Sequence, residues 1–194
     1  WKDECFKWQA VQHFQKHWDI DAGDFGAMFK EATAQVFGLL DTGYAYPRAM
    51  ILEFAKADPE STRQMFRELY DETQDISERV DAFQSAAESL RILHDDGTWK
   101  NHYQSTSAIS VYLWLKCPDK YYLYRYSVSR DIATELNYPT PPKKDGSVDS
   151  MLKSYRLYDE LRDELCKKAA ITQMIRGALE AAPAGTCWPD TQFR

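Results

Sequence analysis

Several features that identify enzymes are absent from this sequence. Its 194 residues include only four cysteines, and these lie too far apart to form the C-x-x-C pairs of zinc and thiol–disulfide redox sites. The glycine motifs that hold nucleotide phosphates and the H-E-x-x-H and G-x-S-x-G motifs of hydrolases are missing as well. The sequence therefore does not indicate an enzyme and predicts no bound cofactor. A cytoplasmic protein with reduced cysteines is the default expectation.

Long apolar runs and compositional extremes are also missing. No apolar run approaches the roughly 20 residues that a membrane-spanning helix needs, so we expect no membrane association. Hydrophobic residues make up 44% and charged residues 28%, the proportions of an ordinary folded domain. We predict a single domain over residues 1–194, with a helical part of about 1–97 and a second part of about 98–194. Because the chain opens at Trp1 without a methionine, we interpret it as a piece of a longer protein.

The charge is negative overall but unevenly distributed. A net charge of −6 counts against nonspecific binding of nucleic acid by the whole surface. Residues 53–96 hold twelve acids and five bases, a balance of −7, whereas residues 99–131 hold five bases and two acids, a balance of +3. The sequence therefore predicts an acidic helical half and a mildly basic segment after it.

Helical periodicity dominates the sequence. Phe6, Ala10 and Phe14 recur every four residues, which is typical of a helix buried on one side. Asp58 and Pro59 indicate a helix start, because a capping side chain is followed by proline at the first helical position. Helices are expected at about residues 2–18, 24–40, 47–57, 59–70, 75–97, 129–136, 148–168 and 171–181.

Residues 108–128 are the one segment with a strand-like pattern. Aliphatic residues alternate from Ile109 to Leu115, Cys117–Lys120 has the composition of a turn, and residues 121–128 form a tyrosine-rich return. We therefore predict an α+β fold, mostly helical with one β-hairpin or small antiparallel sheet. The aliphatic face of this hairpin is expected to be core.

The opposite face of the predicted hairpin allows two interpretations. Helices that cover it would make its tyrosine and tryptophan rings plain core. Left open, the same rings would stack on planar bases while nearby cations hold phosphates. The polar, aromatic and basic loop of residues 97–107 leads directly into it, and loops beside a rigid element often carry binding residues.

Four segments resemble the N-terminal region of McrB-like AAA+ restriction proteins, which are type IV, modification-dependent systems. They are the opening from Trp1 to WDIDAGDF at residues 18–25, YPRAMILEFAKADPE at 46–60, AISVYLWLKCPDKYYLYRYS at 108–127 and TCWPD at 186–190. The resemblance spans most of the chain. These segments are patterns of similarity and contain no catalytic signature.

The resemblance implies a role in anti-phage defence. In such systems the N-terminal region is the specificity module, which recognises DNA with modified cytosine, in known members by flipping a base into an aromatic-lined pocket. A separate AAA+ ring hydrolyses nucleotide and a partner nuclease subunit cuts. We therefore expect a DNA-binding module whose aromatics enclose a base and whose cations hold the backbone. The expected contacts are Trp99, Lys100, His102, Tyr112, Trp114, Tyr124, Arg125 and Arg130.

Two other functions fit the sequence. A protein-interaction module would use the acidic helices of residues 53–96 to bind a partner without touching DNA. A sensor of small molecules or nucleotides would use the same aromatic pocket. A metal site is not expected, because His13 and His17 stand one helical turn apart without an acidic third ligand of obvious spacing.

Overall fold

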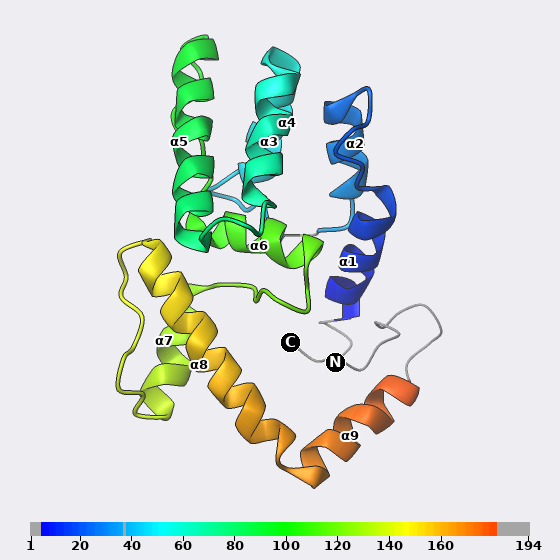
Figure 1. Cartoon of the computed structure of the whole chain (residues 1–194), viewed down its shortest axis with the longest axis vertical. Helices are drawn as coiled ribbons and strands as arrows, with labels where there is room; N and C mark the ends of the chain where they lie inside the picture. The colour runs from blue at the N-terminus through cyan, green and yellow to red at the C-terminus, as the bar shows by residue number, and fades with distance from the viewer. Residues whose placement is uncertain (1–4, 37, 182–194) are drawn as a thin grey trace.

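Helices make up all the regular secondary structure in the part of the chain that the computed structural model describes, residues 5–36 and 38–181 (Figure 1). The TCWPD segment lies outside these residues. No described helix is long and apolar enough to cross a lipid bilayer. The helices are α1 (Cys5–His17), α2 (Phe25–Ala32), α3 (Pro47–Ala57), α4 (Pro59–Leu69), α5 (Ile76–His94), α6 (Thr106–Lys116), α7 (Tyr126–Glu135), α8 (Val148–Cys166) and α9 (Ala169–Glu180).

The predicted β-hairpin is wrong, because its first strand is the helix α6. Ser105 caps this helix by accepting a hydrogen bond from the Ala108 N–H, and every residue from 108 to 115 is buried. Figure 1 shows α6 lying across the lower ends of α4 and α5. A helix surrounded by protein needs no polar face, so its sequence loses the helical period and resembles a buried strand. The fold is therefore all-α over the described residues, and not α+β.

The predicted return strand, residues 121–128, is wrong as well. A turn at residues 118–120 is followed by a segment without regular secondary structure at 121–125, and residues 126–128 are the first turn of α7. The Tyr124 N–H donates to the Ser110 hydroxyl of α6 at 3.0 Å. The buried Arg79 donates to the Tyr121 hydroxyl at 2.9 Å, and that hydroxyl donates to the Glu72 carboxylate at 3.1 Å. Side-chain hydrogen bonds thus hold this segment where a sheet would use backbone pairing.

Several predicted helix boundaries are confirmed and others shift. Asp58 caps α4 by accepting from the Ser61 N–H at 3.0 Å, and these hydrogen bonds lower the pKa of its carboxyl group. By contrast, α2 ends at Ala32 instead of residue 40. The helix predicted to start at Ser129 starts instead at Tyr126, and the Ser129 hydroxyl hydrogen-bonds that of Tyr158 at 2.6 Å.

The part of the chain from α1 to α6 shares an aromatic core, which centres on Phe66 of α4. The side chain of Phe66 is fully buried. Its ring centroid lies between 5.1 and 5.9 Å from six other aromatic centroids. These rings belong to Trp18, Phe25, Phe29, Tyr70, Phe83 and Tyr112. Edge-on and tilted ring contacts of this kind add to the stabilisation from burial alone.

The loop before α8 is fixed by a single carboxylate. Asp145 accepts from the Ser147 N–H at 3.0 Å and from the hydroxyls of Ser147 and Ser150 at 2.7 and 2.9 Å. Because these hydrogen bonds favour the charged form, they lower the pKa of Asp145 from 3.8 to about 2. The charged carboxylate therefore stabilises the start of α8, which lies beside α7 (Figure 1).

Replacing Asp145 with asparagine is expected to lower the urea midpoint of unfolding at pH 7, because the amide accepts weaker hydrogen bonds than the carboxylate. In the native chain the folded pKa lies below the unfolded one, so this contribution is complete above about pH 4 and is lost as the pH falls through about 2. Asp145→Asn should therefore also show a smaller drop in midpoint between pH 5 and pH 2. The matched control is Asp163→Asn, at an exposed position on α8; an equal effect there would contradict the prediction.

Candidate nucleic-acid interface

Two aromatic residues predicted to contact DNA lie in the core. Tyr112 is 0% exposed, and its hydroxyl donates to Gln104 Oε1 at 3.1 Å. Burial raises the pKa of this hydroxyl well above its usual range, so it remains a donor. Trp114 is also buried. Because the predicted hairpin is absent, its open aromatic face is absent too, and neither ring is accessible to a base in this structure.

The loop between α5 and α6 holds three more of the predicted residues. Trp99 packs edge-on against Phe54 of α3 with the ring centroids 5.6 Å apart, and its backbone N–H donates to Asp95 at 2.9 Å. Lys100 is exposed. His102 is half-buried and accepts from the Gln104 N–H, and burial lowers its pKa. Only Lys100 in this trio is open to a ligand.

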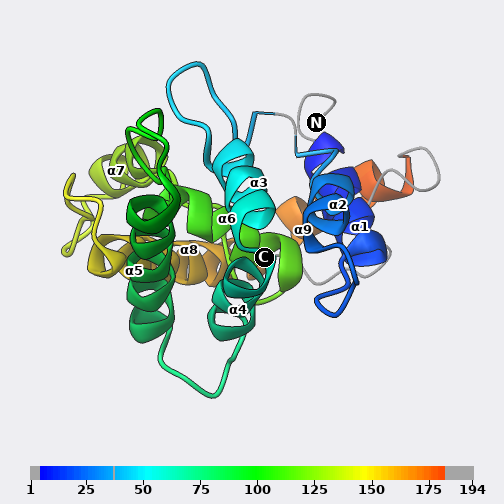
Figure 2. The ribbon, with the colours of Figure 1, turned by 90° about the horizontal axis from the view of Figure 1, so that it is seen from above.

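Tyr103 belongs to the predicted binding loop, and the sequence reasoning missed the two tyrosines that lie near it in the chain before α3, Tyr44 and Tyr46. Tyr103 has a backbone φ of 58°, a left-handed conformation that is uncommon for a bulky residue. Its ring lies edge-on to that of Tyr46, with centroids 6.1 Å apart. Tyr46 is 47% exposed and Tyr44 is 96% exposed. Both belong to the loop before α3, which extends away from the helices (Figure 2).

A groove lies where α1, α6 and the start of α7 meet the segment after α2. It has a volume of about 420 Å³. Its cations are Lys7 of α1 and Arg125, and no carboxylate is present among the described residues that line it. We call it the Lys7–Arg125 groove. Its lining consists of Phe6, Lys7, Gly38, Leu39, Ser107, Val111, Leu123, Tyr124, Arg125 and Val128.

Tyr124 and Arg125 are the two predicted residues that the structure brings together in this groove. Tyr124 is 3% exposed, and its hydroxyl has no hydrogen-bond partner among the described residues. Burial raises the pKa of this hydroxyl, and the nearby Asp145 carboxylate raises it further. The Arg125 side chain is exposed. Arg125 is the N-cap residue of α7, and its side chain makes no capping hydrogen bond to this helix.

Arg130 lies on α7 outside the lining of the groove. Its guanidinium pairs with Asp131 at 2.6 Å and lies over the ring of Tyr126, 5.8 Å from the centroid. The ion pair raises the pKa of Arg130. This cation is therefore partly neutralised by its neighbour, unlike Arg125.

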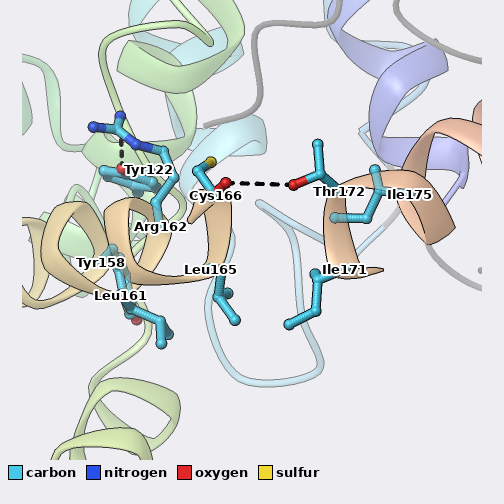
Figure 3. Close-up of a pocket in the computed structure, with 9 residues that line it drawn as sticks. All are labelled: Tyr122, Tyr158, Leu161, Arg162, Leu165, Cys166, Ile171, Thr172 and Ile175. Atoms are coloured by element: carbon cyan, nitrogen blue, oxygen red, sulfur yellow. Dashed lines mark hydrogen bonds between the residues drawn. The ribbon is translucent and has the colours of Figure 1, made fainter. Parts of the chain in front are cut away.

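A second groove, between α8 and α9, is almost wholly apolar. It has a volume of about 270 Å³, and Figure 3 shows Leu161 and Leu165 of α8 with Ile171 and Ile175 of α9 around it. Two hydrogen bonds join its lining residues: Arg162 donates to the Tyr122 hydroxyl at 3.4 Å, and the Thr172 hydroxyl donates to the Cys166 carbonyl oxygen at 3.5 Å (Figure 3). Nothing among the described residues shows what covers this groove.

Known proteins give no guide to either groove. Comparisons of the chain with protein-family models, with curated proteins and with solved structures found no match. The geometry and charge of the Lys7–Arg125 groove therefore carry the functional inference.

Proposed function

We propose that this chain is the DNA-recognition module of a McrB-like restriction system and that DNA binds at the Lys7–Arg125 groove. The observation that carries the proposal is the exposed guanidinium of Arg125 in a groove whose described lining has no carboxylate, in a protein with a net charge of −6. An acidic protein binds phosphates through such local positive sites. The resemblance of residues 108–127 to McrB-like N-terminal regions favours DNA over other anions.

The groove also offers surfaces that suit a base. Its volume of about 420 Å³ lies within the range of small-ligand pockets, and Phe6 and Val111 supply apolar wall. Flipping a base costs a few kcal/mol. Stacking on an aromatic ring returns roughly 1–3 kcal/mol per base. Phe6, which lines the groove and is only partly buried, is the ring that would stack on the base. The resemblance to McrB-like proteins makes a modified cytosine our proposed target.

The alternative of a protein-interaction module using the acidic helices has weaker support. Many of the carboxylates of residues 53–96 are paired within the protein. Glu88 bonds Arg91 at 2.7 Å, and Glu72 pairs with Lys120. Pairing of this kind removes part of the charge that a basic partner would bind, although the segment stays acidic.

Arg125→Glu is expected to lower the affinity for duplex DNA at least tenfold, because it replaces a phosphate-binding cation with a repelling anion. Fluorescence anisotropy at 50 mM salt with plain, methylated and hydroxymethylated duplexes measures this. Two phosphate contacts, one for each cation of the groove, also predict that raising the salt from 50 to 200 mM weakens wild-type binding by about tenfold.

Arg156→Glu is the matched control, since Arg156 is an exposed cation on α8 that does not line the groove. Its affinity should stay within about twofold of wild type. Equal losses in both variants would indicate a general charge effect and count against the groove. If no duplex binds at 50 mM salt, the DNA-recognition proposal itself is wrong.

A further inference from the structure

Two histidines of α1 and one glutamate of α2 form a cluster that the sequence did not reveal. The imidazoles of His13 and His17 lie one turn apart, with ring centroids separated by 4.2 Å. Glu31, in the last turn of α2, places its Oε1 3.4 Å from His13 Nε2 and 4.0 Å from His17 Nε2. The fold thus supplies the acidic third group that the sequence lacked, from a position 14 residues further along the chain.

Hydrogen bonds already orient one imidazole toward the cluster. His17 Nδ1 lies 2.8 Å from the His13 carbonyl oxygen, so Nδ1 carries the proton and donates it. The lone pair of His17 is then on Nε2, the atom that faces Glu31. A backbone carbonyl that fixes the tautomer in this way is the usual support for a metal-binding histidine.

The second imidazole needs a small rearrangement. His13 Nε2 lies 2.8 Å from the Glu31 carbonyl oxygen and donates to it when no ion is bound. A metal ion bound at His13 Nε2 would replace the proton on that atom, and the neutral imidazole would then carry its proton on Nδ1. The side chains of His13 and His17 are 15% and 29% exposed, whereas that of Glu31 is 60% exposed. The imidazoles are therefore held against the protein, and the carboxylate is free to rotate onto an ion.

We propose that His13, His17 and Glu31 bind a divalent transition metal, with zinc as the reference ion, and that the metal joins α1 to α2. The three ligand atoms lie within 4.8 Å of one another. Tetrahedral zinc, with ligand distances of about 2.0–2.2 Å, would bring them to about 3.3–3.5 Å apart. Rotation of side chains covers that difference. Two imidazoles and a carboxylate leave the fourth position to water, an arrangement typical of zinc sites.

Titration of the full chain with zinc chloride in a calorimeter is expected to show one site with a Kd of about 10 µM or tighter. Saturating zinc should raise the Tm of the wild type. His17→Ala and Glu31→Gln should each weaken binding at least tenfold and remove most of the Tm shift. Glu31→Gln keeps the backbone carbonyl that His13 contacts, so it tests the carboxylate alone.

Cobalt supplies the readout that separates this site from the cysteines. Bound Co²⁺ should give visible absorption without the near-ultraviolet charge-transfer band of a thiolate ligand. His102→Gln, which changes a histidine elsewhere in the protein, should bind zinc as the wild type does, and so should Arg125→Glu. A thiolate band, full affinity in His17→Ala, or no saturable zinc binding would each overturn the proposal.

Discussion

Replacing Phe66 with alanine is expected to lower the free energy of unfolding by about 4 kcal/mol, a large part of the stability of a domain of this size. The ring is fully buried and contacts six other aromatic rings from several helices and the segment after α1. Helices α2, α5 and α6 all supply rings to this cluster, so no single neighbour can move in to fill the cavity.

Urea unfolding followed by circular dichroism measures this loss. Ile92→Ala is the matched control, because it removes a large aliphatic side chain from α5 at a position that is 67% exposed. Its free energy of unfolding should stay within about 0.5 kcal/mol of wild type. A loss below about 1.5 kcal/mol in Phe66→Ala would mean that the aromatic cluster is not the centre of the core.

The helix that carries Phe66 was predictable because its signals are local. Asp58 and Pro59 specify a start whatever the rest of the chain does, and the structure places both at the predicted cap and first helical positions. The inward face with Met65, Phe66 and Leu69 follows the helical period, because the other side of α4 faces solvent. Amphipathic helices with a clear capping residue can thus be predicted from this sequence.

The strand prediction for the residues of α6 was wrong for the opposite reason. Residues 108–115 are buried on every side, so the contrast between polar and apolar faces that reports the period is missing. The β-branched and aromatic residues that remain, among them Val111 and Tyr112, favour strands when considered singly. Tertiary burial overrides that preference here, and the Ser105 cap was the one local signal that favoured a helix.

The candidate site was predictable only in part. Tyr124 and Arg125 were chosen from a basic, aromatic segment, and both line the groove. Lys7 comes from the other end of the chain, and no local pattern connects it with Arg125. Tyr44 could have been noticed as an aromatic residue beside Gly43 in a turn, where little can bury it. Residues brought together by the fold, including Glu31 at the histidines, need the structure.

Gln104→Leu is expected to lower the free energy of unfolding by roughly 3 kcal/mol, although leucine has a similar volume. The side chain of Gln104 is 0% exposed and makes three hydrogen bonds. Its amide donates to the carbonyl oxygens of Pro47 and His102 at 2.9 and 2.8 Å, and its oxygen accepts from the Tyr112 hydroxyl at 3.1 Å. Leucine would leave the buried Tyr112 hydroxyl without this acceptor and remove the amide donor from the His102 carbonyl oxygen, and a buried polar group left without a partner costs about 1–3 kcal/mol.

A double-mutant cycle with Tyr112→Phe separates this network from general disruption of the core. Removing both partners should cost less than the sum of the single changes, because a phenylalanine ring at this position leaves no hydroxyl to satisfy. Gln64→Leu, an exposed position on α4, is the control and should change stability by less than about 0.5 kcal/mol. Strict additivity would refute the network. Since Gln104 joins the 95–105 loop to α3, its loss should also expose Trp99, and a red shift in tryptophan fluorescence would report it.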